Sequence, residues 1–389
     1  MPEFSPRTEV SIEGDRFLIN GVPTQKDLSF HDVSIEGLLL NSRMANAVFD
    51  DSNEFTRHLW AYPDNGKWDP KRNTDELIEM LPTYISKGLN CIDINLQGAS
   101  PLGYYRSDTE GLCNLMARIR SKFPDATEQE IWNGLPDTAS QPWNSGAFTG
   151  KGELKPAFMS RTARVIEAAD SIGMVVCLGL FYFGQDERIV DEQAVISAVN
   201  NAISWVLDHG YKNVIIEINN ECDVPRYEHE ILCPDRVHEL LDLSKSISKD
   251  GKRLLMSTSF TRRMIPPETV IKSSDFILLH GNGMHDPGEI TKRIVDTRNS
   301  SSYRGQPVFF NEDDHFKFES ESNNFVAALE KRAGWGFFDP GPGAGGKAAY
   351  GNYIDGYQNP PVNWTINTAR KESFFWFLAE LTGRQSTLE

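Results

Sequence analysis

A (β/α)8 TIM barrel is the fold class that this sequence predicts, and three observations point to it. Short apolar runs typical of strands buried on both faces alternate along the chain with longer segments of helical periodicity. The helix-to-strand connections are tight, as at 171–173 and 209–211, whereas several strand-to-helix connections are long. With 389 residues the chain can form one large barrel, which typically starts from about 250 residues. We therefore expect a single domain over 1–389 rather than a sandwich or a bundle.

The strands are predicted in order from the N-terminus. Segment 1–30 contains the strand-like RFLINGVP, which we expect to form a hairpin packed on the barrel floor. Eight short apolar runs bounded by turn residues then follow as the barrel strands, at 37–44, 91–98, 174–183, 213–219, 253–259, 276–281, 307–312 and 335–339.

Helical segments lie between these strands. In 191–209, apolar pairs recur every four residues and draw one stripe down a helix. The fifth crossover, IPPETVIKSS, has room for only a turn or two of helix. The other predicted helices are 73–88, 155–172, 235–249, 288–298, 321–333 and 367–382. The loops after strands one, two and eight are the long ones, and they are neighbours around a closed barrel.

Two of the predicted strands end in an Asn-Glu pair. VIIEINNECD at 214–223 brings Asn220 and Glu221 to the end of strand four, and PVFFNEDDHF at 307–316 brings Glu312 to the end of strand seven. The two glutamates are 312 − 221 = 91 positions apart, but a barrel gathers its strand ends around one axis. Hydrolysis of a glycosidic bond uses two such carboxyl groups, about 5 to 5.5 Å apart when the anomeric configuration is retained.

These residues resemble clan A of the glycoside hydrolases, the retaining (β/α)8 group that includes cellulase-like and β-galactosidase-like enzymes. The resemblance spans most of the chain and rests on the two motifs and the strand order. It implies a retaining β-glycosidase acting on oligo- or polysaccharide without a cofactor or metal ion. Glu221 would be the acid/base, Glu312 the nucleophile, and Asn220 a donor to the sugar 2-hydroxyl. An ionised Glu312 would favour the protonated form of Glu221, because two like charges in one cleft do not both ionise cheaply.

Other polar strand ends are expected to line the same site. His280 resembles the strand-six histidine of cellulase-like enzymes, which contacts the sugar or the acid/base residue, although a structural role would suit it as well. Arg43 could orient Glu312 or hold Asp50 or Asp51 in the first loop. Three further substrate-binding candidates are Asn95, Gln97 and Tyr182.

Carboxylates near the two motifs are expected to have supporting roles. Strand alternation places Glu217 on the inner face of strand four, so we interpret it as a buried, paired structural carboxylate. For Asn220 and Glu221 both to face a sugar, the strand must end or bulge there. Loop residues expected to cap or support the site are Asp223, Asp313, Asp314 and His315.

Aromatic residues gather in the three long loops. We expect the group to form a wall of a substrate cleft, since flat rings suit the faces of sugars; the alternative for each ring is packing of its own loop. The group comprises Trp60, Trp68, Trp132, Trp143 and Trp364, with Tyr350, Tyr353 and Tyr357. Strand eight ends in FFD without the tryptophan familiar in the clan, so the sequence leaves the sugar unnamed.

Charge and composition exclude several partners. The net charge of −16 offers no basic field for nucleic acid. A neutral sugar is compatible with this charge, whereas a strongly anionic sugar would need a local basic pocket. The sequence has no apolar run of about 18 residues, so no membrane partner is expected. The first residues, MPEFSPRTEV, lack the pattern of a signal peptide, so we expect a cytoplasmic location, or a secreted or periplasmic one if a leader has been removed.

The five cysteines favour free thiols over a disulfide framework. Cys91 and Cys177 lie inside apolar strand runs, which suits buried thiols. Cys222 and Cys233 could pair across a short loop, and the sequence leaves that pairing open.

Rival functions on the same fold are less well supported. A metal-dependent hydrolase would need clustered histidines, yet no His-x-His occurs, and a Schiff-base aldolase would need a lysine on a predicted strand, where none lies. A phosphosugar-binding barrel could use the glycine-rich segment at 341–347, although Lys347 is its only cation. A catalytically silent carbohydrate-binding barrel is the remaining alternative.

Overall fold

A computed structural model describes residues 4–99, 101, 109–135, 141–341 and 353–384 of the chain. All eight predicted barrel strands are present. They are β6 (Leu40–Arg43), β7 (Cys91–Asn95), β8 (Val175–Phe181), β9 (Val214–Asn219), β10 (Leu255–Ser257), β11 (Ile277–His280), β12 (Val308–Glu312) and β13 (Trp335–Phe337). The sequence patterns therefore located every barrel strand, with errors confined to the strand ends.

The predicted helices are also confirmed. They are α1 (Pro70–Ser86), α4 (Pro156–Ser171), α5 (Glu192–Asp208), α6 (Val237–Ser246), α7 (Glu268–Ser273), α8 (Pro287–Arg298), α9 (Asn324–Glu330) and α10 (Ala369–Leu381). The fifth crossover holds only the six-residue α7, as its length suggested. Two helices in the long loop after β7, α2 (Thr109–Lys122) and α3 (Glu128–Ile131), were not predicted. Short 3₁₀ turns occur at Arg57–Trp60, Asp186–Arg188 and Glu230–Leu232.

Local sequence signals explain where the helices begin. Asp69 accepts hydrogen bonds from the amides of Lys71 and Arg72, and Pro70 occupies the first turn of α1, where no intrahelical amide bond is lost. Asp191 caps α5 in the same way through the amide of Ala194. The apolar stripe of α5 is buried, as its four-residue spacing predicted.

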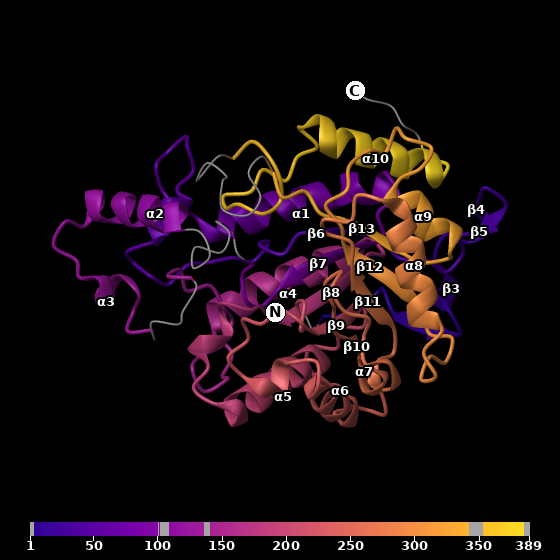
Figure 1. The fold of residues 1–389 in the computed structure, drawn as a ribbon, viewed down its shortest axis with the longest axis horizontal. Coiled ribbons are helices and arrows are strands. Elements are labelled where there is room, and N and C mark those ends of the chain that lie inside the picture. The colour runs from indigo at the N-terminus through magenta and orange to yellow at the C-terminus, as the bar shows by residue number, and fades with distance from the viewer. Residues whose placement is uncertain (1–3, 100, 102–108, 136–140, 342–352, 385–389) are drawn as a thin grey trace.

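The parallel strands follow one another around the barrel. Six of them pair in the order β10-β9-β8-β7-β6-β13, and β11 pairs with β12. Gly334, the residue before β13, connects that strand to β12: it accepts from the amide of Phe310 and donates to the carbonyl of Val308, each at 3.0 Å. No ladder joins β10 to β11 within the described chain, but the amides of Asp275 and His280 donate across that seam to the carbonyls of Met256 and Phe260, each at 3.0 Å. Helices surround the strands, and α2 and α3 project away from this ring (Figure 1). The fold is a (β/α)8 barrel with one open seam.

An N-terminal hairpin closes the barrel floor. It consists of β1 (Val10–Glu13) and β2 (Arg16–Ile19), followed by β3 (Val22–Pro23), β4 (Ser29–Phe30) and β5 (Val33–Ser34). Phe17 packs edge-on against Phe276 and Phe309, with ring centroids 5.6 and 6.0 Å away. It belongs to an apolar cluster with Leu39 and other inward side chains from the first part of the strands β7 to β12. The predicted hairpin at the floor is confirmed.

Above this apolar floor the barrel interior is polar. Because side chains alternate along a strand, the residues two positions beyond the floor also point inward, and they include Asn41, Asp93, Glu217 and Asn311. Asn41 donates to Asp93 and to the carbonyl of Asn311, and Asn311 donates to Glu217 at 3.3 Å. Glycine makes room for this layer: a Cβ on Gly336 would lie 2.4 Å from the amide nitrogen of Asn41.

The buried Asp93 makes stability depend on pH. Burial raises the pKa of Asp93 to about 7, and the charge of Arg43 opposes the rise. The folded state therefore keeps a proton that the unfolded chain releases above pH ~4, so stability should fall by up to about 4 kcal/mol as pH rises from 4 to 7. Asp93→Asn should flatten this slope in denaturant titrations at several pH values. Asp125→Asn, at an exposed position, serves as the control, and an unchanged slope in Asp93→Asn would contradict the assignment.

The structure also answers whether the cysteines pair and whether a described helix could span a membrane. All five cysteines are free, with Cys91, Cys177 and Cys222 buried, so Cys222 and Cys233 do not pair. Within the described ranges, none of the helices combines the length and the apolar character needed to cross a bilayer.

Candidate active site

Glu221 lies in a tight turn where β9 ends. The strand stops at Asn219, and Glu221 adopts a left-handed backbone conformation with φ of 49°. Its amide donates to the hydroxyl of Ser259 at 2.8 Å. The next turn is held by Asp223, which accepts from the amide of Thr261 at 2.8 Å. This turn breaks the strict alternation of the strand, so that neighbours Asn220 and Glu221 both reach the site.

Glu312 reaches the site through a bulge in β12. His280 of β11 pairs with Glu312, whereas Leu279 pairs with Phe310, so Asn311 is an extra residue in β12. The bulge lets both Asn311 and Glu312 face the barrel axis. The Glu312 carboxylate accepts a hydrogen bond from Asn282 Nδ2 at 2.6 Å and forms an ion pair with Arg43, whose Nε lies 3.1 Å from Oε2.

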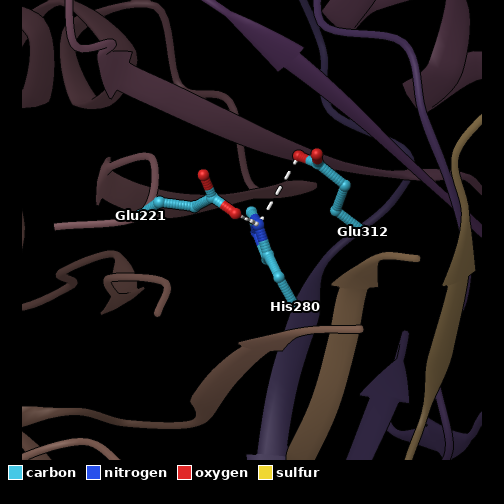
Figure 2. Close-up of side chains that lie close together, drawn as sticks. All are labelled: Glu221, His280 and Glu312. Carbon is cyan, nitrogen blue, oxygen red and sulfur yellow. Dashed lines mark hydrogen bonds and ion pairs between the residues drawn. The ribbon is translucent and has the colours of Figure 1, made fainter. Parts of the chain in front are cut away.

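His280 connects the two glutamates. Its Nδ1 lies 3.0 Å from Glu221 Oε1 and 3.6 Å from Glu312 Oε2 (Figure 2). One ligand atom from each of the three residues lies within 4.8 Å of the others, so an oxygen of Glu221 and an oxygen of Glu312 are within that distance. Across the described part of the chain, this is the one group of three or more such side chains that could hold a metal ion.

Arg43 ties three strand ends together beneath this cluster. Its guanidinium is fully buried and contacts Glu217 Oε2 at 2.8 Å, the amide oxygen of Asn220, and Glu312. Burial opposes the charge of Glu217, but Arg43 and His280 outweigh it and lower the pKa of that carboxyl. Glu217 is the buried, paired carboxylate that was predicted. Because it balances the charge of Arg43, the cation is stable inside the barrel.

Burial and the charges of neighbouring side chains shift the pKa values of Glu312 and His280. Burial raises the pKa of Glu312, against the opposing charges of His280 and Arg43, and the charge of Glu221 adds to the rise. Burial lowers the pKa of His280, but Glu312 and Glu221 more than offset it, so the pKa of His280 is raised. Both shifts favour the protonated forms of Glu312 and His280.

The other predicted substrate-binding residues divide into two groups. Asn95 lies in the polar interior beside Glu217, where the missing side chain of Gly179 leaves room for both. Gln97 and Tyr182 instead pack a neighbouring loop: Gln97 accepts from the amide of Tyr182 and donates to the carbonyl of Gln185. The ring of Tyr182 stacks on Phe183.

The predicted aromatic wall is wrong for the tryptophans that the structure buries. Trp60 and Trp143 pack together in a satellite core, and Trp364 stacks on Tyr357 while donating to the carbonyl of Asn73. Trp132 ends α3, away from the ring of helices in Figure 1. Trp68 and Tyr353 are partly buried and both pack against Tyr62. The loops are long enough to form small apolar cores of their own, so these aromatic side chains are buried in the loops and do not line a cleft. Tyr350 and all but the first residue of the glycine-rich segment 341–347 lie outside the described residues.

The loop carboxylates near the motifs have the supporting roles that were predicted. Asp313 accepts from the amide of His315, from Asn324 Nδ2 and from Trp335 Nε1. Asp314 accepts from the amide of Gly283. These bonds fix the loop after β12 and hold Glu312 in place.

Two residues in contact with the glutamates were missed from the sequence. Asn282 holds Glu312, and Ser259 holds the backbone of Glu221. Asn282 lies two positions after His280, so strand periodicity continued past the end of β11 would have placed both on one face. Ser259 carries no comparable signal, because its role depends on the turn that follows β9.

Comparisons with known proteins agree on the fold. No family model matches the chain, and no curated protein matches its sequence. Among solved structures it resembles a glycoside hydrolase family 5 protein from Bacteroides vulgatus ATCC 8482, with a TM-score of 0.51 and 13% identity over 95% of this chain and 70% of that one. It also resembles an endo-1,4-beta-mannanase from Rhizomucor miehei, with a TM-score of 0.54 and 11% identity over 97% of this chain and all of that one.

A third similar structure is larger than this chain. An FMN-binding beta-glucuronidase from Facaelibacterium prausnitzii L2-6 matches with a TM-score of 0.50 and 11% identity over 97% of this chain but 47% of that one. At these identities the likeness establishes the fold: the chain has the (β/α)8 barrel found in glycoside hydrolases. The three proteins carry names of unlike activities, so the fold does not name a sugar.

Proposed function

We propose that the protein is a retaining glycoside hydrolase that cleaves a β-glycosidic bond in an oligo- or polysaccharide. The observation that carries this proposal is the pair of carboxyls at the strand ends, with oxygens of Glu221 and Glu312 within 4.8 Å of each other. Retaining enzymes place their carboxyls about 5 to 5.5 Å apart, whereas inverting enzymes need about 6.5 to 9.5 Å to admit a water molecule. The fold shared with glycoside hydrolases supports the same class.

The contacts of each glutamate suggest its role. Glu312 is fixed at both carboxylate oxygens, because Asn282 donates to Oε1 and Arg43 forms an ion pair with Oε2, which orients the group as a nucleophile. It attacks the anomeric carbon, the bond to the leaving oxygen breaks, and Glu221 gives that oxygen its proton. Glu221 then takes a proton from water, which attacks the glycosyl-enzyme and releases Glu312 as a carboxylate. Two inversions at one carbon give net retention.

Asn220 is oriented toward the substrate. Arg43 donates to its amide oxygen, which assigns the other end of the amide as nitrogen. That nitrogen is buried and has no partner within the described part of the chain. We infer that it donates to the sugar hydroxyl next to the anomeric carbon, a bond that strengthens in the transition state.

Product analysis tests the proposal. Purified protein is screened on a panel of aryl glycosides and polysaccharides, and the anomer first formed from the best substrate is identified by NMR. We expect hydrolysis with the β-anomer as the initial product. An α-anomer would contradict the retaining mechanism, and binding without turnover of any substrate would indicate a silent carbohydrate-binding barrel instead.

A further inference from the structure

A basic pocket lies beside the candidate active site. It is a solvent-open pocket of about 440 Å³ between the loop that follows β10 and the outer face of α8. Its charged lining consists of Arg262, Arg263, Lys292, Arg293, Glu289 and Asp296. Four cations thus face two carboxylates, in a chain whose net charge is −16. A local reversal of charge of this kind favours an anionic ligand.

Two of the four cations remain available. Lys292 pairs with Asp296 on the same helix, and Arg293 is buried, donating to the carbonyls of Thr261 and Met264. Arg262 and Arg263 are exposed and, within the described ranges, neither forms an ion pair. Arg262 donates one hydrogen bond to the carbonyl of Gly283 at 3.1 Å, which leaves most of the N–H groups of its guanidinium available to a ligand. Arginine is the side chain best suited to bind a planar carboxylate or a sulfate through two parallel hydrogen bonds.

The pocket adjoins the acid/base side of the site. The loop that carries Arg262 begins at Ser259, which binds the backbone of Glu221, and continues through Thr261, which binds Asp223. Burial lowers the pKa of Arg293 to about 10, and the charges of Asp223 and Glu221 are close enough to offset part of that fall. Gly283, held by Arg262, follows Asn282, which binds Glu312.

The position beside Glu221 decides which part of the substrate would meet the pocket. A general acid must lie next to the oxygen that it protonates, so the leaving-group portion of the substrate lies on the Glu221 side. The next sugar beyond that oxygen would extend toward the loop that carries Arg262 and Arg263.

We propose that this protein acts on substrates whose leaving-group portion carries an acidic group, a carboxylate or a sulfate ester, which binds Arg262 and Arg263. This inference rests on the proposed glycosidase function and specifies its substrate class. Because the pocket is open to solvent, the attraction is screened by salt.

Binding measurements test the inference without requiring turnover. Calorimetric titrations compare an oligogalacturonate and a sulfated oligosaccharide with a neutral cello-oligosaccharide of equal length. We expect at least one acidic probe to bind about 10-fold more tightly than the neutral one at low salt, with the difference shrinking in 0.5 M NaCl. The acidic probe that binds more tightly relative to the neutral one identifies carboxylate or sulfate as the recognised group.

Paired variants assign the effect to the pocket. Arg262→Ala/Arg263→Ala should remove the preference and leave neutral binding unchanged, Arg262→Glu/Arg263→Glu should reverse it, and Lys26→Ala, at a distant exposed site, should match wild type. No preference in wild type, or a preference that survives both double variants, overturns the inference. A preference without hydrolysis of any glycoside would contradict the proposed function and leave the pocket as an anion-binding site only. Hydrolysis without a preference would contradict this inference alone.

Discussion

Glu221→Ala is expected to stall after forming a covalent intermediate. With a dinitrophenyl glycoside the leaving group needs little protonation, so the variant should release one equivalent of phenolate in a burst. Its steady-state rate should fall about 10³-fold, because no base remains to activate water. Azide needs no base and should restore turnover, giving a glycosyl azide of retained configuration. Stopped-flow absorbance and NMR of the product measure both effects.

Glu312→Ala should behave differently. Without the nucleophile the variant should show no burst and should lose about 10⁶-fold in kcat, the order seen when a protease loses its nucleophilic serine. Any azide rescue should give the inverted product. Glu380→Ala, an exposed glutamate on α10, is the matched control and should keep full activity. Identical behaviour of the two site variants, or full activity in either, would show that the roles are assigned wrongly.

Arg43→Met should cost about 3 to 5 kcal/mol of stability. Arg43 and Glu217 are both fully buried, so removing the cation leaves an uncompensated carboxylate inside the barrel. Glu312 also loses its ion pair and Asn220 a hydrogen-bond donor, so kcat should fall as well. Denaturant unfolding and steady-state kinetics measure the two losses separately.

A double variant separates folding from positioning. Arg43→Met/Glu217→Gln removes both charges, so it should regain most of the lost stability. It should not regain activity, because no cation then holds Glu312. Recovery of both properties together would mean that Arg43 acts on the reaction only through the fold.

The sequence predicted the barrel because every strand is buried on both faces. A continuous apolar run survives errors of a residue or two at either end, as β8 and β9 illustrate. The two glutamates were selected for a related reason: each belongs to an Asn-Glu pair at the point where a strand-like run ends. Arg43 and His280 were selected as polar residues at other strand ends.

The sequence predictions that were wrong or missing concern features that depend on contacts between loops. Nothing in the residues around Trp143 or Trp364 distinguishes a ring that packs its own loop from one that lines a cleft, because both segments mix polar and apolar residues without periodicity. The helices α2 and α3 were missed within the same long loop. The basic pocket was also invisible, since Arg262 and Lys292 come from different elements that only the fold brings together.

The bulge in β12 determines which face of the strand carries the side chain of Glu312. Side chains alternate between the two faces of a strand, so a shift of one residue moves every later side chain to the opposite face. Because Asn311 is one residue too many for the pairing with β11, Asn311 and Glu312 both point inward. If the same residues formed a regular strand without the bulge, Asn311 would still point inward and the carboxylate of Glu312 would turn toward the surrounding helices. A distant relative could therefore keep the same glutamate in its sequence and lack the site altogether, and alignments of this region should be judged by strand parity as well as by residue identity.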